Sequence, residues 1–308
     1  MQATKSEAEK VIINDVGPRD GLQNQAQILS VEQRQQLINT LVGAGLPAIE
    51  VGSFVSPKAV PAMAGTGLLV ADLPKNNCHY TALIPNAKGY QLAKEAGVKS
   101  MGLVLAASNT MNEKNIRMTT AEALSECKKI IEQSKADGIE ITAYVATAWG
   151  CHFEGEISQS AVIEYTSELL NAGAAQVIVA DTIGSANPAT VTELMTQMVN
   201  EFGAQRLACH FHDTRGMGLT NVYAALQTGI RHFDASIGGL GGCPFSPGAS
   251  GNVATEDVVL MLEQMGYDTG IDLKKLVAAS ELAKELTGNC QGGHGLSWLQ
   301  RQRDTGLL

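Results

Sequence analysis

Two histidines separated by one residue carry the sharpest chemical signal in the chain. His210 and His212 stand in the apolar segment LACHFHDT (207–214). Residues two apart on a β-strand point to the same face, so both imidazoles would project together. Neutral imidazoles near a carboxylate bind divalent metal ions, and Asp20 could supply that carboxylate. The alternative is a pair of hydrogen-bonded core histidines, but a strand end with Asp20 nearby favours a metal site.

An amide oxygen would complete the ligand set. Asn252 follows the last predicted strand and could add its side-chain oxygen to the donors of Asp20 and the histidines. Oxygen and imidazole donors without a thiolate suit Mg²⁺ or Mn²⁺ better than structural zinc. Simpler interpretations exist for both residues: Asp20 could form a turn before Gly21, and Asn252 could cap a helix that starts near Ala254.

A glycine-rich segment, GGLGGCPFSPGASGN (238–252), contains a cysteine. Such a segment lets the backbone approach a ligand closely, or it is merely a flexible connector. Cys243 stands here rather than in an apolar strand, and a thiol with a reference pKa of about 8.5 can donate a proton where a metal ion or an arginine tunes it. The other cysteines include no C-x-x-C pair, so we expect buried thiols in a reducing compartment rather than a zinc site or a disulfide framework.

The elements that must position these residues repeat one unit: a helical stretch, a glycine and a short β-branched run. The glycine suits the left-handed end of a helix. A capping box at 30–33 marks the start of one helix, and apolar periodicity predicts others over 119–137, 158–172, 187–202 and 217–228. The predicted strands lie within 11–17, 48–54, 79–85, 100–108, 139–148, 176–184, 207–214 and 232–239, and the repeated glycines are Gly45, Gly97, Gly138, Gly173, Gly203 and Gly229.

Eight alternating strands and helices predict an α/β fold, a single (β/α)8 TIM barrel with catalytic loops at the C-terminal ends of the strands. An open, doubly wound sheet is the alternative, because counting units does not prove closure. Polar residues fall where the barrel would place its chemistry. The segment 17–24 follows strand one, Glu50 interrupts strand two, and Asp181 and Thr182 end strand six.

Composition narrows the class of protein. The 308 residues are 44% hydrophobic and show no linker, so we expect one domain over 1–308, with a flexible lead over 1–10 and a helical extension, one helix and a polar end, over about 272–308. A net charge of −9 without a basic run argues against nucleic acid. The chain lacks the ~20 consecutive apolar residues of a membrane span and an apolar leader segment, so a cytoplasmic location is expected.

Five segments together resemble the 3-hydroxy-3-methylglutaryl-CoA (HMG-CoA) lyases, within the DRE-TIM metallolyase group, over nearly the whole chain. The cysteine-containing segment is the one most specific to the lyases. The resemblance implies an acyl-CoA substrate, one Mg²⁺ or Mn²⁺ ion, a homodimer, and a place in leucine degradation and ketone-body metabolism. The segments are VGPRDGLQN (16–24), IEVGSFVSPKAVPAM (49–63), VADTIG (179–184), CHFHDT (209–214) and GGLGGCPFSPGASGNVATED (238–257).

The same resemblance implies a retro-Claisen cleavage of (S)-HMG-CoA to acetyl-CoA and acetoacetate, and it implies a role for each site residue. Arg19 would stabilise the enolate of the departing acetyl-CoA, Cys243 would donate a proton, and Glu50 would assist proton transfer. His210 would be both a ligand and a catalytic residue. The implied metal ligands are Asp20, His210, His212 and Asn252. The residues that would contact either the substrate or the side chains around it are Gln23, Ser53, Asp181 and Thr182.

Two departures from the family concern the acyl group. Gln25 and Ala26 stand where many members have an acidic and then a basic residue, so a positive charge that could meet coenzyme A is missing. Trp149 follows strand five where the family usually has a smaller residue. A lyase for citramalyl-CoA or for an isoprenoid-derived hydroxyglutaryl-CoA is therefore an alternative. Candidate replacement charges are Lys58, Lys88, Lys114 and Arg117.

Three other classes share the architecture. A condensing synthase of the isopropylmalate or homocitrate type has the same H-x-H-D sequence, but the Cys243 segment argues against it. A biotin-dependent carboxyltransferase also has this architecture, but no M-K-M biotin-acceptor sequence occurs in the chain. A non-catalytic metal-binding or scaffold barrel would not need Arg19, Asp20, both histidines, Cys243 and Asn252 together.

Overall fold

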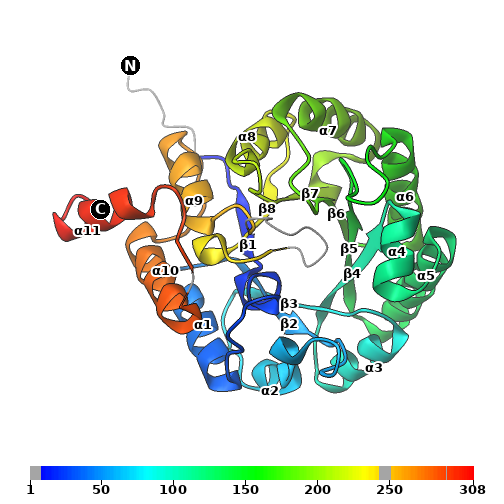
Figure 1. Ribbon diagram of the computed structural model, residues 1–308, viewed down its shortest axis with the longest axis horizontal. Helices are drawn as coiled ribbons and strands as arrows, with labels where there is room; N and C mark the ends of the chain where they lie inside the picture. Colours follow the sequence, from blue (N-terminus) through cyan, green and yellow to red (C-terminus); the bar gives the residue numbers. More distant parts are fainter. Residues whose placement is uncertain (1–7, 243–250, 289) are drawn as a thin grey trace.

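The computed structural model describes residues 8–242, 251–288 and 290–308, and these form a closed barrel of eight parallel strands (Figure 1). Strand β1 (Ile12–Asp15) pairs with β8 (His232–Ala235), and this pairing closes the barrel. The predicted TIM barrel is confirmed and the open sheet is excluded. The intervening strands are β2 (Ala48–Ser53), β3 (His79–Leu83), β4 (Ser100–Ala106), β5 (Glu140–Ala146), β6 (Gln176–Asp181) and β7 (Leu207–Phe211).

A ring of helices surrounds the strands (Figure 1). Helix α1 begins at the predicted capping box, where Ser30 Oγ accepts from the Gln33 amide and Gln33 Oε1 accepts from the Ser30 amide. The six repeated glycines all have positive φ, as the left-handed helix ends require. The ring consists of α1 (Val31–Gly43), α2 (Thr66–Ala71), α3 (Ala87–Glu95), α4 (Asn109–Ile116), α5 (Thr120–Asp137), α6 (Gln159–Ala172), α7 (Pro188–Phe202), α8 (Gly218–Gln227) and α9 (Thr255–Gln264).

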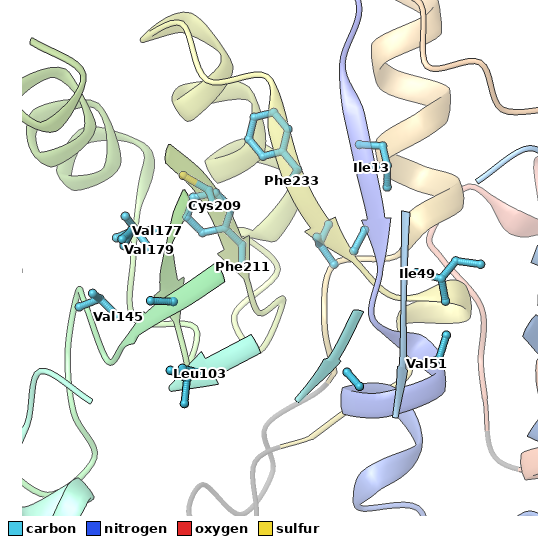
Figure 2. Close-up of a cluster of buried hydrophobic side chains, with 14 of the residues drawn as sticks. Ile13, Ile49, Val51, Leu103, Val145, Val177, Val179, Cys209, Phe211 and Phe233 are labelled. Carbon is cyan, nitrogen blue, oxygen red and sulfur yellow. The ribbon is translucent and has the colours of Figure 1, made fainter. Parts of the chain in front are cut away.

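The main core lies between the strands and the helices. Alternate strand residues point outward, and Figure 2 shows ten of them labelled in one buried cluster, among them Ile13, Val51 and Phe211. The opposite set of side chains faces the barrel interior, where Tyr144 and Ala208 belong to a small separate cluster. The barrel interior and the outer core are therefore filled by different residues of the same strands.

The carboxyl-terminal extension differs from the sequence prediction. Two helices, α10 (Leu273–Thr287) and α11 (Leu296–Asp304), occupy the C-terminal extension, where the sequence predicts one helix. The second helix is held because Leu296 and Leu299 are buried against α10. At the start of the described chain, Glu9 forms an ion pair with Arg231. Among the described residues, no helix is long and apolar enough to cross a bilayer.

Candidate active site

A cavity of about 290 Å³ lies at the carboxyl ends of the strands. We call it the upper chamber. One wall is apolar, with Val104, Ala106 and Met111 among its members. The chamber brings together most of the residues that the sequence predicted, namely Arg19, Asp20, Gln23, Ser53, Thr182, His210 and His212.

The turn that carries Arg19 and Asp20, Gly17–Gly21, is held from below by a buried aspartate. Asp15 accepts from the Gly17 amide at 2.8 Å and from Thr255 Oγ1 at 2.7 Å. A side chain at position 17 would displace Asp15, because a Cβ there would lie 2.7 Å from Asp15 Oδ1. These contacts make the turn a rigid support for the two charged side chains.

Three potential metal ligands converge in the chamber. One ligand atom from each of Asp20, His210 and His212 lies within 4.8 Å of the others. Asn252 joins them from the loop after β8: its amide nitrogen donates to Asp20 Oδ2 at 2.8 Å, and its buried Oδ1 has no hydrogen-bond partner among the described residues. Oxygen and imidazole donors with one unsatisfied buried amide oxygen fit a hard divalent cation.

Arg19 links the carboxylates of the site. Its Nε donates to Glu50 Oε2 at 2.5 Å and its Nη1 donates to Asp20 Oδ1 at 2.7 Å. Burial opposes the charge of Arg19, but Glu50 and Asp20 outweigh it and raise the pKa of the guanidinium. Burial would likewise raise the pKa of Asp20, but Arg19 and the two histidines hold it far below the usual range. Asp20 is therefore an ionised ligand at neutral pH.

Glu50 lies beneath Arg19 and is fully buried. Its Oε1 has no hydrogen-bond partner within residues 8–242, 251–288 and 290–308, while Oε2 accepts from Arg19. Burial raises the pKa of Glu50 above the ordinary range of a carboxyl group, against the effect of Arg19. A buried carboxylate with one free oxygen can accept and release a proton, in line with the expected role of Glu50.

Two residues of the site escaped the sequence prediction. Asp234 Oδ2 accepts from His210 Nδ1 at 2.9 Å, and Tyr144 lines the chamber with its ring edge-on to His210. Burial and the charge of Asp234 raise the pKa of Tyr144 well above its ordinary value. The available signal was an acidic residue inside the apolar strand HFDAS, the same signal that identified Glu50.

The remaining predicted contacts divide into two groups. Ser53 and Thr182 line the chamber, and Thr182 Oγ1 also accepts from the Thr147 amide at 2.8 Å. Asp181 does not line it: its carboxylate accepts from the Ser185 and Ala186 amides at 2.7 and 3.0 Å. Asp181 is expected to contact either the substrate or the residues around it. The geometry favours the second role, because the Asp181 carboxylate shapes the loop after β6.

Trp149 also lies away from the chamber. Its indole nitrogen donates to the Thr190 carbonyl at 3.2 Å, and its ring packs 5.4 Å from that of Phe211. Trp149 therefore packs behind β7 and does not line the chamber. Of the charges considered for coenzyme A, Lys114 and Arg117 flank Asn115 and Ile116, which line the chamber.

Cys243 lies outside the described residues. The residue before it, Gly242, lines the upper chamber, and the Gly242 carbonyl accepts from Asn24 Nδ2 at 3.0 Å. The described part of the segment thus reaches the chamber.

Comparisons with known proteins identify the family of the chain. The HMGL-like family model matches residues 10–283. A citramalyl-CoA lyase, the (R)-specific enzyme of Chloroflexus aurantiacus, is 42% identical, with 91% of this chain and 92% of that protein covered. The hydroxymethylglutaryl-CoA lyase of Pseudomonas mevalonii is also 42% identical, with 89% of each chain covered. An HMG-CoA lyase from Acinetobacter baumannii, in complex with coenzyme A and 3-methylmalate, superposes with a TM-score of 0.91 at 40% identity, and 96% of each chain is covered.

Proposed function

This chain belongs to the HMGL-like family of carbon–carbon lyases, and from that membership we propose that it cleaves (S)-3-hydroxy-3-methylglutaryl-CoA to acetyl-CoA and acetoacetate. The observation that carries the proposal is the convergence of Asp20, His210 and His212 beside Arg19. The reaction is a retro-Claisen cleavage: the substrate hydroxyl loses its proton, a ketone forms, and the adjacent carbon–carbon bond breaks to leave a thioester enolate.

The metal would be held by Asp20, His210, His212 and Asn252, whose donors suit Mg²⁺ or Mn²⁺. Bound there, a divalent cation would lower the pKa of the tertiary hydroxyl and orient it. For His210, the hydrogen bond to Asp234 leaves Nε2 as the nitrogen available to the ion.

Arg19 would meet the charge that develops on the departing thioester oxygen. Two of its three nitrogens are engaged by Glu50 and Asp20, and within the described chain Nη2 has no hydrogen-bond partner. A planar donor held in place by two carboxylates needs no reorganisation when the enolate forms, which is the condition for strong transition-state stabilisation. Glu50 would accept the hydroxyl proton, because it is a buried carboxylate next to Arg19.

Cys243 would protonate the enolate carbon. The support from the described residues is indirect: Gly242, its neighbour in sequence, lines the chamber that would contain the enolate. The thioester of coenzyme A would enter past the end of α4, where Lys114 and Arg117 stand, and the relative with bound coenzyme A supports an acyl-CoA substrate. We also propose a homodimer and, by its family, a role in leucine degradation and ketone-body metabolism.

Cleavage of citramalyl-CoA is the second candidate, because one relative at 42% identity has this activity. The two substrates differ by one methylene between the reacting carbon and the free carboxylate. A single methylene is worth only about 10- to 200-fold in specificity. The small apolar wall of the chamber is compatible with the methyl group that both substrates carry.

The deciding experiment compares both substrates on the purified protein with Mg²⁺ or Mn²⁺. Acetoacetate reports HMG-CoA cleavage, and pyruvate reports citramalyl-CoA cleavage. We expect a kcat/KM at least tenfold higher for HMG-CoA. A tenfold preference for citramalyl-CoA would replace the proposed substrate, and failure on both with metal bound would exclude both. Cys243→Ala, compared with Cys78→Ala at a position far from the chamber, tests the proton donor.

A further inference from the structure

The amino-terminal half of the barrel interior is open, which is unusual for this fold. Barrel interiors are normally filled by layers of branched side chains. Here the inward positions of several strands carry small or hydroxyl side chains, and a second cavity of about 450 Å³ lies between the strands at their amino ends. We call it the lower cavity. The small and hydroxyl residues that line it are Ala48, Thr81, Gly102, Thr142 and Ala208.

Polar atoms without partners line this cavity. Glu50 Oε1 and Asn14 Oδ1 are both buried and have no hydrogen-bond partner in the part of the chain that the structure describes. An unsatisfied buried carboxylate oxygen is costly, and a polar cavity that offers several such partners normally contains ordered water. The lower cavity therefore has the chemistry of a water site.

The mouth of the lower cavity faces solvent. His79 and Glu140 lie on its rim with about half of each side chain exposed, 51% and 48%. His232, also on the rim, has its Nδ1 2.9 Å from Gln176 Nε2. Water in the cavity can thus exchange with the bulk at the end of the barrel opposite the upper chamber.

Two ion pairs and one aromatic ring separate the two cavities. Glu50 lines the lower cavity and its partner Arg19 lines the upper chamber. In the same way, Asp234 lines the lower cavity and His210 lines the upper chamber, and Asp234 Oδ2 lies 2.9 Å from His210 Nδ1. Tyr144 lines both cavities. The carboxylate that would receive the substrate proton is therefore in contact with the lower cavity.

We propose that the lower cavity holds a chain of water molecules through which Glu50 exchanges its proton with solvent at the amino end of the barrel. The inference rests on the proposed function. The substrate O–H bond breaks in the upper chamber, and its proton passes to the hydroxyl oxygen of Tyr144, which lines both cavities and releases its own proton to the Glu50 carboxylate. Glu50 then loses that proton to water in the lower cavity. The enolate carbon takes one proton from the donor at the carboxyl end, and the donor regains one proton from solvent there. One proton leaves at one end and one is consumed at the other, so the reaction balances.

The openness of the cavity is tested by cysteine labelling, which needs no substrate turnover. Thr142→Cys places a thiol in the cavity wall, and Val145→Cys is the matched control on the opposite face of the same strand, where the side chain is fully buried. Both are treated with methyl methanethiosulfonate in the presence of Mn²⁺ and without coenzyme A, whose free thiol would consume the reagent. We expect labelling at position 142 at least tenfold faster than at 145, by peptide mass mapping. Equal, slow labelling would show a sealed barrel and overturn the proposal.

The function of the cavity is tested by filling it. Ala208→Leu should lower kcat at least tenfold, leave Mn²⁺ affinity unchanged and increase the solvent deuterium isotope effect on kcat, because proton exchange becomes limiting. Ala121→Leu, on the exposed side of α5, is the control and should change nothing. If Ala208→Leu does not fold, the double variant Thr81→Val/Thr142→Val removes two wall hydroxyls at nearly constant volume and is measured in the same way.

The wild-type protein tests the proposed function, whereas the Ala208→Leu variant tests the inference about the lower cavity. A wild type that cleaves neither substrate refutes the function, and with it the role of the cavity. A wild type that cleaves its substrate, beside a folded, metal-binding Ala208→Leu with unchanged kcat and isotope effect, refutes the inference alone.

Discussion

His210 Nδ1 donates to Asp234 Oδ2 at 2.9 Å, and this bond determines which imidazole nitrogen is left for a metal ion. Asp234 is itself held, because its Oδ1 accepts from Asn14 Nδ2 at 2.8 Å. A carboxylate behind a ligand histidine orients the ring and raises its basicity. Burial disfavours the charged form of His210, but Asp234 outweighs it and raises the pKa of the imidazole.

Asp234→Asn should weaken the metal site without removing a ligand. The amide carries no charge to polarise His210, so affinity for Mn²⁺ should fall about 10- to 100-fold. Isothermal titration calorimetry with Mn²⁺ measures this loss. Asp72→Asn, at an exposed position of similar chemistry, is the control and should bind as the wild type does. An unchanged affinity in Asp234→Asn would mean that the hydrogen bond does not support a metal ligand.

Removal of the metal should abolish activity until metal is added back, whereas the activity lost in His210→Ala should not return when metal is added. Chelation with EDTA followed by Mn²⁺ should restore the wild type, whereas His210→Ala should remain on the order of 10³-fold slower at saturating Mn²⁺. A ligand that binds only the folded state raises the melting temperature, so Mn²⁺ should stabilise the wild type and not the variant. Full activity of His210→Ala would refute the assignment of this ligand.

Arg19→Lys should impair turnover more than binding. A lysine ammonium can reach one carboxylate but cannot donate to Glu50, Asp20 and a thioester oxygen from one plane. We expect kcat to fall about 10²- to 10³-fold, the usual cost of one preorganised oxyanion donor. Steady-state kinetics with Mn²⁺ titration separates this loss from loss of metal. Arg301→Lys, on the exposed face of α11, should be neutral.

The free energy of unfolding should depend on pH through Asp15. Burial raises the pKa of Asp15 to about 7 in the folded chain, although Thr255 and Gly17 oppose it. Between about pH 4 and pH 7 the folded chain therefore keeps a proton that the unfolded chain has lost. The contribution of Asp15 to stability falls as pH rises through this window and is constant above it.

Asp15→Asn imitates the protonated acid and removes this dependence. Urea unfolding of both proteins at pH 5 and pH 8 should show the variant gaining stability relative to the wild type as pH rises, by at most about 1.4 kcal/mol per pH unit. A difference that does not change with pH would contradict the raised pKa.

Local patterns predicted most of the architecture. The β-branched runs, the glycines that end the helices and the capping box at Ser30 depend on residues close in the chain, so the order of the amino acids is enough to recognise them. The H-x-H spacing is local in the same sense, because alternation along one strand determines that His210 and His212 share a face. Motif resemblance added the family.

Contacts between segments that are far apart in the sequence could not be predicted from local patterns. Asn252 meets Asp20 across 232 positions, and Asp234 meets His210 only because β7 and β8 pair in the register that closes the barrel. Whether Asp181 faces the chamber or its own loop likewise depends on how the end of β6 packs.

The fold, the family and the candidate metal ligands therefore follow from the order of the amino acids, since they depend on periodicity and on residue types at short spacing. The partner of each buried charge and the open lower half of the barrel follow only from the packing of the whole chain. Small inward side chains such as Gly102 and Ala208 carry no periodic signal, and they form a cavity only when eight strands bring them around one axis.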